Sequence, residues 1–515
     1  MEQAKHQNLY AILKEGFPAD GSTVAIETTT RTYCWDELDH ISSQLAYWLH
    51  SLGLPQGARV AVQVEKTPEA LLLYLATLRA GLVYLPLNTA YSASEVDYFL
   101  GDAQPAVLVG ASQHLHWLKP LAQAHQIEHV LTLEADGTGS LMEAAAELGT
   151  DFATVAVGWD DLAAILYTSG TTGRSKGAML THGNLSSNAL TLKSYWGWQQ
   201  DDVLLHMLPI FHIHGLFVAC HGALIAGARM VWLPSFDAKL AIRYLPQCTV
   251  MMGVPTYYVR LLAQPEFNRD LCKNMRLFIS GSAPLLADTF TAFEQRTGMT
   301  ILERYGMSET VMNTSNPYDQ TKTKRLAGTV GAALPGIEIR VVDDNDQTVE
   351  IGTPGHVQVR GPNVFRGYWK MPEKTQEEFT QDGWFRTGDI GVLGGESIPD
   401  TYLSIVGRSK DLIISGGYNV YPKEIELVID ELPGVRESAV IGVPHADFGE
   451  AVLAVIVPEE GAQLDLTAML STLKKQLANY KLPKKMDVIS ELPRNTMGKV
   501  QKNVLRDRYT NSFVS

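Results

Sequence analysis

Short apolar runs alternate with helix-like segments through the first half of the chain. Residues 59–64, 82–85 and 106–109 are strand-like, and residues 68–80 have a helical pattern. Parallel strands need long crossover connections, so this alternation predicts mostly parallel β-sheets flanked by helices. The sequence contains no internal repeat and no low-complexity segment, and we expect a large α/β domain.

The C-terminal part of the chain follows a different pattern. Residues 437–443 and 451–457 resemble neighbouring strands, residues 466–479 a helix and residues 486–489 a short strand. This pattern predicts a separate, compact α+β unit. More than one domain is expected in any case, because the 515 residues exceed the roughly 250–300 that one hydrophobic core can serve.

The boundary between the domains is expected near residues 407–411. This segment is short and polar and begins with a glycine, as a hinge would. We therefore predict a large N-terminal domain at 1–407, a hinge at 408–411 and a small C-terminal domain at 412–515.

The charge balance constrains the partners. Lys and Arg number 42 against 56 Asp and Glu, which gives a net charge of −14. A nucleic acid or an anionic membrane is therefore not expected as the main partner. An anionic substrate would have to meet a local group of donors, because the overall field repels it.

Cysteine usage and apolar segments indicate a cytoplasmic location. The four cysteines are far apart and form no C-x-x-C pair, so neither a disulfide framework nor a structural zinc site is expected. The N-terminus lacks the apolar core of a signal peptide. The most apolar stretch, residues 71–87, is interrupted by Arg79, Gly81 and Pro86, which is typical of a buried helix and strand and not of a membrane span.

The strongest local signal is the segment Tyr167–Gly177, with the sequence YTSGTTGRSKG. It lies between the strand-like residues 162–166 and 178–180. Its glycines let backbone N–H groups converge on an anion, and its hydroxyl and cationic side chains supply further donors. The segment lacks the Walker spacing, and a flexible surface loop is the ordinary alternative. The density of donors between two strands favours a polyphosphate ligand.

Three weaker clusters follow. In residues 304–310 a tyrosine face could stack a purine and Glu309 could hold Mg²⁺, which prefers oxygen ligands. In residues 384–390 a carboxylate could accept hydrogen bonds from ribose hydroxyls. Residues 493–502 form a basic turn before a last helix, in which Lys499 could equally be a solvated surface charge.

Together these ordered motifs resemble those of the adenylate-forming superfamily, which contains acyl-CoA synthetases, non-ribosomal adenylation domains and firefly luciferase. The resemblance covers nearly the whole chain and implies an α/β protein. Its large N-terminal domain would hold mostly parallel sheets and a β-subdomain, and its small, mobile C-terminal domain would be α+β. The implied cofactors and co-substrates are ATP, Mg²⁺ and coenzyme A.

The resemblance also implies roles for individual residues. The catalytic group would be Lys499, Glu309 and Lys176. The ATP site would comprise Thr168, Ser169, Gly170, Thr171, Thr172, Gly173, Lys176, Ser282, Ala283, Tyr305, Thr310, Asp389, Arg408 and Lys499. Glu309 and Thr168 would hold the metal. Gly416, Gly417 and Tyr418 would line the path for CoA, and Lys410 occupies the hinge position.

Four segments resemble malonyl-CoA synthetases more closely, namely residues 209–215, 254–260, 276–285 and 303–316. By that resemblance Arg260 would grip the distal carboxylate with help from Ser282, and His212 and Met307 would line the acid pocket. Arg276 is an alternative gripping group, and Arg260 could instead be a surface residue of its helix.

The implied reaction converts malonate, ATP and CoA to malonyl-CoA, AMP and diphosphate through an acyl-adenylate, with methylmalonate as a further substrate. The main alternative is an acyl-CoA synthetase for another short-chain or aromatic acid. A carrier-loading adenylation enzyme, a luciferase-like oxygenase and a non-catalytic binding protein are the other classes. The expected partners are a small dicarboxylic acid, ATP and CoA, without nucleic acid or membrane, and the protein is expected to be a monomer or homodimer.

Overall fold

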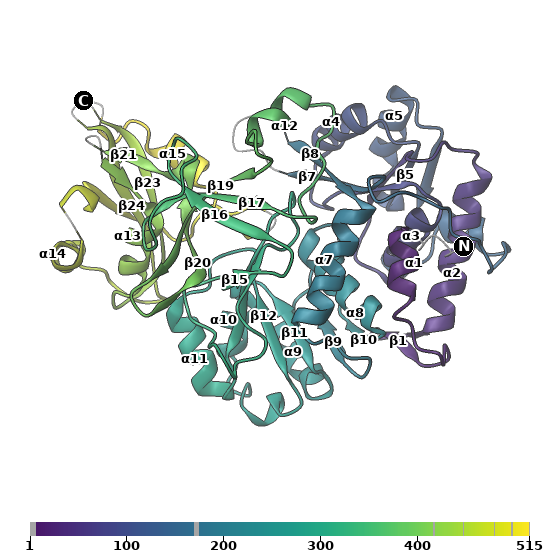
Figure 1. The fold of residues 1–515 in the computed structure, drawn as a ribbon, viewed down its shortest axis with the longest axis horizontal. Helices are drawn as coiled ribbons and strands as arrows, with labels where there is room; N and C mark the ends of the chain where they lie inside the picture. Colours follow the sequence, from purple (N-terminus) through teal and green to yellow (C-terminus); the bar gives the residue numbers. More distant parts are fainter. Residues whose placement is uncertain are drawn as a thin grey trace. The chain divides into compact units, whose positions relative to one another are not determined.

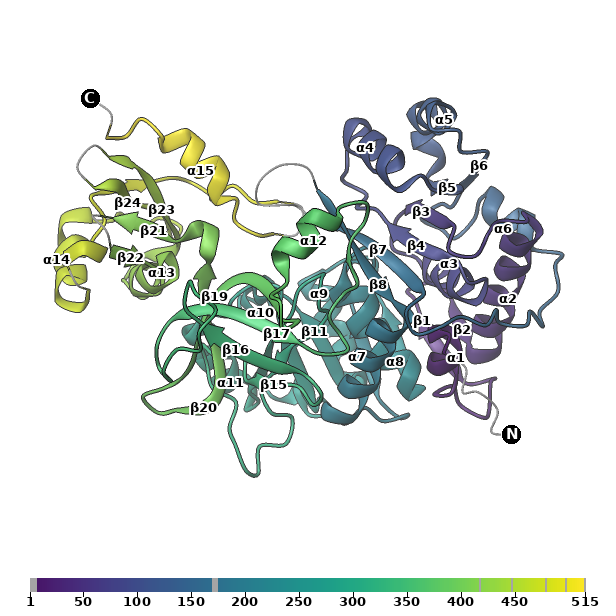
Figure 2. The same cartoon turned by 45° about the horizontal axis from the view of Figure 1, so that its top comes forward.

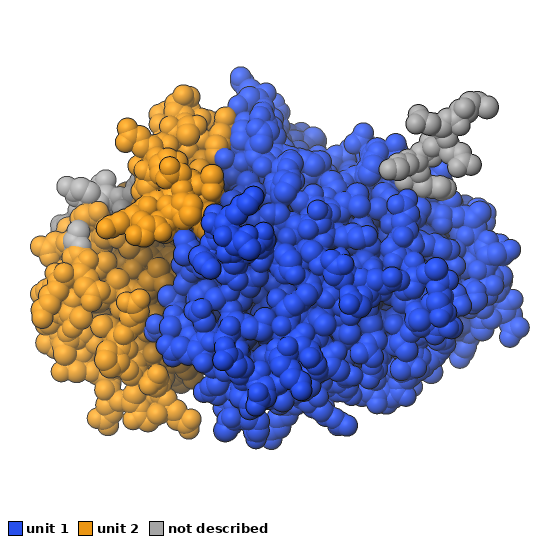
Figure 3. All heavy atoms as spheres, turned by 60° about the horizontal axis from the view of Figure 1, so that its bottom comes forward, with its two compact units in different colours: residues 1–339, 359–385 blue, residues 340–358, 386–515 orange. Residues whose placement is uncertain are grey.

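The computed structural model describes residues 7–168, 175–415, 418–445, 448–477, 479–495 and 498–513. The chain divides into two compact units, which Figure 3 colours separately. Unit 1 contains residues 1–339 and 359–385, and unit 2 contains residues 340–358 and 386–515. The predicted hinge at 408–411 therefore lies inside unit 2, and its role as a hinge stays a prediction.

Unit 1 contains a seven-stranded sheet in the order β18-β8-β7-β4-β3-β5-β6 (Figures 1 and 2). Its central strands are parallel, whereas β7, β8 and β18 pair antiparallel. Helix α2 packs beside α3, and α3 contacts β4. The strands are β3 (Arg59–Gln63), β4 (Val83–Pro86), β5 (Val107–Gly110), β6 (His129–Thr132), β7 (Leu162–Thr168), β8 (Lys176–Thr181) and β18 (Gly367–Tyr368). The helices of this part are α2 (Trp35–Ser51), α3 (Pro68–Arg79), α4 (Ala93–Ala103), η1 (Ser112–His114), α5 (Leu115–Ala124), α6 (Ser140–Ala145) and α12 (Pro372–Glu378).

A nine-stranded sheet, in the order β15-β14-β13-β12-β11-β9-β10-β1-β2, forms the rest of unit 1. The strands from β1 to β13 in this order are parallel, and the edge strands are antiparallel. The strands are β1 (Val24–Glu27), β2 (Thr32–Cys34), β9 (Val203–His206), β10 (Arg229–Trp232), β11 (Val250–Gly253), β12 (Leu277–Ser280), β13 (Ile301–Tyr305), β14 (Thr314–Ser315) and β15 (Ala332–Ala333). The helices are α1 (Leu9–Lys14), α7 (His182–Tyr195), the π-helix η2 (His214–Cys220), α8 (His221–Ala226), α9 (Ala238–Tyr244), η3 (Leu245–Gln247), α10 (Pro255–Leu262), η4 (Asp270–Cys272) and α11 (Ala287–Thr297).

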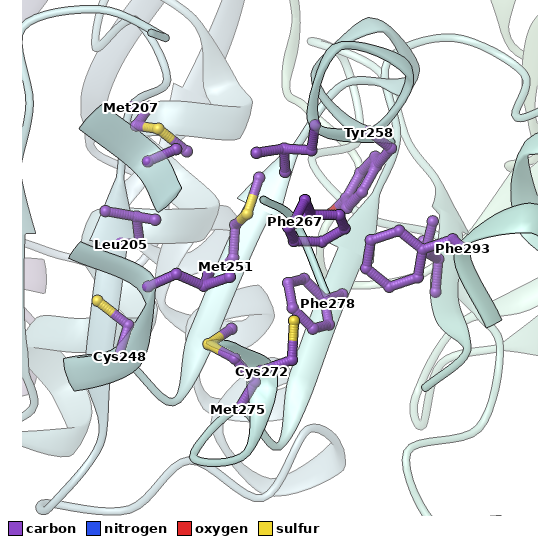
Figure 4. Packing of buried hydrophobic residues seen from close by; sticks show 14 of the residues in the cluster. Leu205, Met207, Cys248, Met251, Tyr258, Phe267, Cys272, Met275, Phe278 and Phe293 are labelled. Carbon is purple, nitrogen blue, oxygen red and sulfur yellow. The ribbon is translucent and has the colours of Figure 1, made fainter. Parts of the chain in front are cut away.

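One face of the nine-stranded sheet packs on α10 and α11 through a core of aromatic and sulfur-containing side chains. Figure 4 shows Tyr258, Phe267, Phe278 and Phe293 in contact, with Met251 beside them. All these side chains are fully buried, and burial of each large apolar side chain contributes roughly 1.5–3 kcal/mol. This core fixes the strand ends from which the candidate site is built.

Unit 2 holds most of a four-stranded sheet and all of a five-stranded one. The first has the order β16-β17-β19-β20 and corresponds to the predicted β-subdomain. In the second, β23 and β24 form a long antiparallel pair, and α15 packs on β23 (Figure 2). The strands are β16 (Glu338–Val342), β17 (Gly355–Arg360), β19 (Phe385–Gly395), β20 (Ile398–Arg408), β21 (Ile413–Ser415), β22 (Tyr418–Val420), β23 (Val435–His445), β24 (Gly449–Pro458) and β25 (Lys485–Val488). The helices are η5 (Ser409–Asp411), α13 (Pro422–Asp430), α14 (Leu466–Gln476), η6 (Asn479–Lys481) and α15 (Lys502–Tyr509).

The predicted fold class is confirmed. Mostly parallel sheets flanked by helices form the large unit, and an α+β arrangement forms the C-terminal part. The predicted neighbouring strands at 437–443 and 451–457 are β23 and β24. Among the described residues, no helix is both long enough and apolar enough to span a bilayer.

Candidate active site

The candidate phosphate loop connects two paired strands. β7 and β8 are antiparallel neighbours, with Tyr167 opposite Gly177 and Thr168 opposite Lys176. The Tyr167 hydroxyl donates to the Asp102 carboxylate at 2.5 Å, which anchors the end of β7. The hairpin therefore holds Thr168 and Lys176 at the base of the loop. The other predicted phosphate ligands, Ser169, Gly170, Thr171, Thr172 and Gly173, lie outside the described residues.

Lys176 has two neighbours from later in the chain. Its ammonium lies 4.4 Å from the ring centroid of Tyr368 and 3.6 Å from a carboxylate oxygen of Glu378. Tyr368 belongs to β18, which pairs with β8, and its hydroxyl donates to Glu309 Oε1 at 3.0 Å. The structure thereby brings the predicted phosphate-loop lysine and the predicted metal carboxylate close to one side chain.

Glu309 and Thr310 lie on a tight turn after β13. A Cβ at Gly306 would lie 1.8 Å from the Val311 carbonyl oxygen, so only glycine fits there. Val311 has a φ of 54°, which is strained for a β-branched residue. Both Glu309 and Thr310 are buried, and the Thr310 hydroxyl has no hydrogen-bond partner among the described residues.

The donor set at this turn fits Mg²⁺. Glu309, Thr310 and Thr168 offer only oxygen atoms, which a hard cation prefers. Within the described parts of the chain there is no group of three or more His, Cys, Asp and Glu side chains that could hold a metal ion.

The carboxyl ends of parallel strands meet at one edge of the nine-stranded sheet, as expected for a ligand site in an α/β fold. β12 leads to Ser282 and Ala283, and β13 ends at Tyr305. Ser282 has a φ of 70°, and its hydroxyl lies 3.3 Å from Nδ1 of His214, which begins the π-helix η2. Ala283 is exposed, and Tyr305 is half-buried.

Arg304, next to Tyr305, is a buried cation that the motif analysis did not single out. Its side chain is 3% exposed, and neither Nε nor Nη2 has a hydrogen-bond partner among the described residues. A Cβ at Gly281 would lie 2.4 Å from the guanidinium carbon, so the glycine allows this close approach. Burial lowers the pKa of Arg304 to about 9, so the group remains protonated at neutral pH.

The buried His214 ring lies close to Ser282 and Arg304. Burial and the nearby Arg304 hold the pKa of His214 well below its usual value, so the ring is neutral at neutral pH. Its Nε2 atom also lacks a hydrogen-bond partner in the described structure. Buried N–H groups without hydrogen-bond partners are costly, and an anionic ligand placed against Nε and Nη2 of Arg304 would remove that cost.

The other predicted acid-pocket residues differ in their surroundings. Arg260 is exposed on α10, and its side chain makes no hydrogen bond or ion pair with any described residue. Arg276 is bound in place, because it pairs with Asp202 through Nε at 2.7 Å and Nη2 at 2.5 Å and also donates to the Trp196 carbonyl at 3.0 Å. These contacts leave Arg276 little freedom to grip a substrate. His212 follows β9 and Met307 follows β13, and both are half-buried.

The predicted ribose ligands are adjacent in unit 2. Asp389 of β19 stands opposite Arg408 of β20, and Arg408 Nε lies 2.7 Å from the Asp389 carboxylate. The next residue, Ser409, donates to the Gly388 carbonyl at 3.1 Å. Burial lowers the pKa of Lys410, the predicted hinge residue.

Lys499 is exposed and precedes α15. Its backbone N–H donates to the Asn495 side chain at 2.9 Å, and its carbonyl accepts from the Asn495 N–H at 2.9 Å. Of the predicted CoA residues, Gly416 and Gly417 lie outside the described residues, and Tyr418 begins β22.

Two residues of this region were missed by sequence reasoning. For Arg304 a signal existed, since Glu303 and Arg304 place two adjacent charges in a strand whose other residues are apolar. For Tyr368 there was none, because nothing in the sequence connects it with Glu309.

The fold and these motifs define an adenylate-forming enzyme, and the comparisons identify its family. The chain belongs to the AMP-binding enzyme family, whose main domain matches residues 15–369 and whose C-terminal domain matches residues 424–499. Mitochondrial malonate–CoA ligase ACSF3 of Mus musculus is 38% identical over 84% of this chain and 78% of its own. A feruloyl-CoA synthase of Amycolatopsis is 34% identical over 93% of this chain and 94% of its own.

A solved structure is more similar still. ATP-bound MatB from Rhodopseudomonas palustris is 52% identical, with a TM-score of 0.94 over 99% of this chain and 100% of its own. The apo form of the same protein gives a TM-score of 0.84. The fold of this chain is therefore that of a solved member of the family over 99% of its length.

Proposed function

We propose that this protein is an AMP-forming malonate–CoA ligase. It would convert malonate, ATP and CoA to malonyl-CoA, AMP and diphosphate, and would also accept methylmalonate. The observation that carries the choice of acid is the buried guanidinium of Arg304, whose Nε and Nη2 atoms have no hydrogen-bond partner among the described residues. The similarity to malonate–CoA ligases and to MatB supports the same choice.

The first half-reaction joins the acid to AMP. One carboxylate oxygen attacks the α-phosphorus of ATP, and the bond to the bridging oxygen breaks to release diphosphate. Lys176 and Thr168, with the loop between them, would bind the phosphates. Glu309 and Thr310 would hold Mg²⁺, which when bound would neutralise charge on the phosphate oxygens.

Lys499 would bring a cation to the attacking carboxylate and the α-phosphate. Tyr305 would pack on the adenine, and the paired Asp389 and Arg408 would bind the ribose hydroxyls. The product is a mixed anhydride, which the closed site would protect from water.

The second half-reaction transfers the acyl group. The CoA sulfur attacks the acyl carbon, and AMP leaves with the electrons of the broken C–O bond. A rotation about residues 408–411 would remove Lys499 and bring Gly416, Gly417 and Tyr418 to the path of the pantetheine arm. This alternation would let one site use Lys499 for adenylation and then admit CoA for thioester formation.

The acid pocket distinguishes a dicarboxylate from other acids. Only one carboxylate of malonate reacts, and the second must leave water for a site that contains a cation. Arg304 would bind it with a planar fork of donors, Ser282 would assist, and Arg260 would lie at the outer side. A monocarboxylic or aromatic acid would leave Nε and Nη2 of Arg304 buried without hydrogen-bond partners, so the alternative substrates fit less well.

A panel of acids tests this proposal. ATP- and CoA-dependent AMP release should be measured with malonate, methylmalonate, butyrate and ferulate under identical conditions. We expect kcat/KM for malonate to exceed that for butyrate by about 100-fold or more, because the charge pair is worth several kcal/mol. Equal or better use of butyrate or ferulate would rule out the malonate assignment and leave only the family.

A further inference from the structure

Tyr368 contacts two residues to which the proposed function gives separate tasks. Its hydroxyl donates to Glu309 Oε1 at 3.0 Å, and its ring centroid lies 4.4 Å from the ammonium of Lys176. Lys176 would bind phosphate and Glu309 would hold Mg²⁺. The two residues are far apart in the sequence, and this one side chain lies against both.

The position of Tyr368 is fixed from several sides. In β18 it stands opposite Ala178 of β8, the strand that begins with Lys176. Its backbone N–H donates to the Thr375 hydroxyl at 2.9 Å, and its ring meets that of Phe365 edge-on at 4.9 Å. The Phe365 N–H in turn donates to the Glu309 carbonyl at 2.7 Å. The ring and the Glu309 turn are thus held by the same short segment.

Each contact has a separate physical effect. The negative face of an aromatic ring attracts an ammonium group and limits where it can lie. A phenolic O–H that donates to a carboxylate oxygen fixes the orientation of that carboxylate, as partners of metal ligands commonly do. Tyr368 and Glu309 are buried, so water competes little for the bond between them, and the Lys176 side chain is only 19% exposed.

We propose that Tyr368 is a positioning residue. It holds the Lys176 ammonium and the Glu309 carboxylate in the positions needed to bind the phosphates and the Mg²⁺ of one ATP molecule. The ring sets the lysine, and the hydroxyl sets the carboxylate. This inference rests on the proposed roles of Lys176 and Glu309. It predicts that the two contacts of Tyr368 can be removed one at a time with different consequences.

The test measures ATP binding by calorimetry over a range of Mg²⁺ concentrations, without malonate or CoA. Tyr368→Phe keeps the ring and removes the hydroxyl, so the Mg²⁺ concentration for half-maximal ATP binding should rise about tenfold or more. At saturating Mg²⁺ its affinity for ATP should match the wild type. Tyr368→Leu also removes the ring, and its affinity at saturating Mg²⁺ should fall a further two- to fivefold, or roughly what an ammonium–ring contact contributes.

A matched control exists elsewhere in unit 1. Tyr33, which is also buried, donates its hydroxyl to the buried carboxylate of Glu69. Tyr33→Phe removes the same kind of bond and should lower thermal stability, yet leave the Mg²⁺ dependence of ATP binding unchanged. A shift in Mg²⁺ dependence as large as that of Tyr368→Phe would show that loss of a buried bond, and not position, causes the effect, and would overturn the proposal.

Two further variants separate this inference from the proposed function. Glu309→Gln and Lys176→Met should each weaken ATP binding more than Tyr368→Phe does. If both weaken it but Tyr368→Phe behaves as the wild type, the positioning role is wrong and the proposed site stands. If Glu309→Gln also keeps the wild-type Mg²⁺ dependence, the role of Tyr368 and the metal site are both wrong. Should Tyr368→Leu fail to fold, the Tyr368→Phe isotherm alone decides the question.

Discussion

Two arginines beside or within neighbouring parallel strands of the nine-stranded sheet differ in how many hydrogen-bond partners they have. Arg276 immediately precedes β12, at the amino end of the sheet, and its guanidinium binds the Asp202 carboxylate and the Trp196 carbonyl. Arg304 lies near the end of β13, at the carboxyl edge, and two of its nitrogen atoms have no partner among the described residues. Both strands pair directly with each other in parallel register.

The difference shows how this fold separates structure from function. A buried cation that only supports the fold should be paired, because an unpaired one destabilises it. Arg276, whose side chain is 21% exposed, has Asp202 as its partner. Nε and Nη2 of Arg304 have none among the described residues, and Arg304 lies where Ser282 and Tyr305 also gather. We infer that the cost of burying Arg304 persists because a ligand carboxylate supplies the missing partner.

The largest effect is expected from Arg304→Met. It should lower kcat/KM for malonate about 10²–10³-fold, since a buried carboxylate would lose its partner at a cost of roughly 3–4 kcal/mol. Use of butyrate should stay level or improve, because the pocket becomes apolar. Steady-state kinetics on both acids, at saturating ATP and CoA, measure this change.

The same variant should not lose stability. Replacing an unpaired buried charge with an apolar side chain is neutral or stabilising, so the melting temperature should stay level or rise. The opposite outcome is a large drop in melting temperature together with equal losses of kcat/KM for malonate and butyrate. It would mean that Arg304 stabilises the fold as Arg276 does and does not bind the acid.

Arg276→Met should show the reverse behaviour. It leaves Asp202, which is 3% exposed, without its cation, and the free energy of unfolding should fall by about 3 kcal/mol. The ratio of malonate to butyrate use should not change. Urea unfolding gives the stability difference, and Arg243→Met, which alters an exposed arginine on α9, is the matched control with an expected change within about 0.5 kcal/mol.

The sequence predicted the elements of this comparison but not their pairing. Apolar runs such as residues 437–443 and 451–457 were recognisable as strands because a buried strand is apolar on both faces. The phosphate hairpin was recognisable because glycines and hydroxyls interrupt two such runs. These signals are local, and the structure agrees with them.

The contacts that distinguish the arginines are not local. Arg276 meets Asp202 from 74 positions away, and Tyr368 meets Glu309 from 59 positions away. No periodicity records such distances, so Arg276 remained a candidate gripping group and Arg304 received no role. The lack of a partner at Arg304 is a property of three-dimensional packing, which one sequence does not display.

A smaller effect is expected from Arg260→Met. Arg260 is exposed on α10, where solvent screens its charge, so its attraction for a malonate carboxylate should be worth roughly 0.5–1 kcal/mol, or about two- to fivefold in kcat/KM. Kinetics with malonate at two ionic strengths test this, because a screened interaction weakens in salt. A loss larger than that of Arg304→Met would move the gripping role to α10 and reverse our ranking of the two residues.

The smallest effect concerns how the free energy of unfolding depends on pH below about 6, which the Arg276–Asp202 pair should determine. Burial alone would raise the pKa of Asp202, but hydrogen bonds from Arg276 and Thr249 outweigh it and hold the pKa below the ordinary value. A carboxylate whose pKa is lower in the folded state stabilises the fold above its unfolded pKa of about 3.9, and this contribution disappears as the pH falls through the folded value. The free energy of unfolding of the wild type should therefore approach that of Arg276→Met as the pH is lowered from about 6 to below 4. Urea unfolding of both proteins across this range measures the gap, and a gap that stays constant would mean that the stability supplied by Arg276 comes from packing and not from its pairing with Asp202.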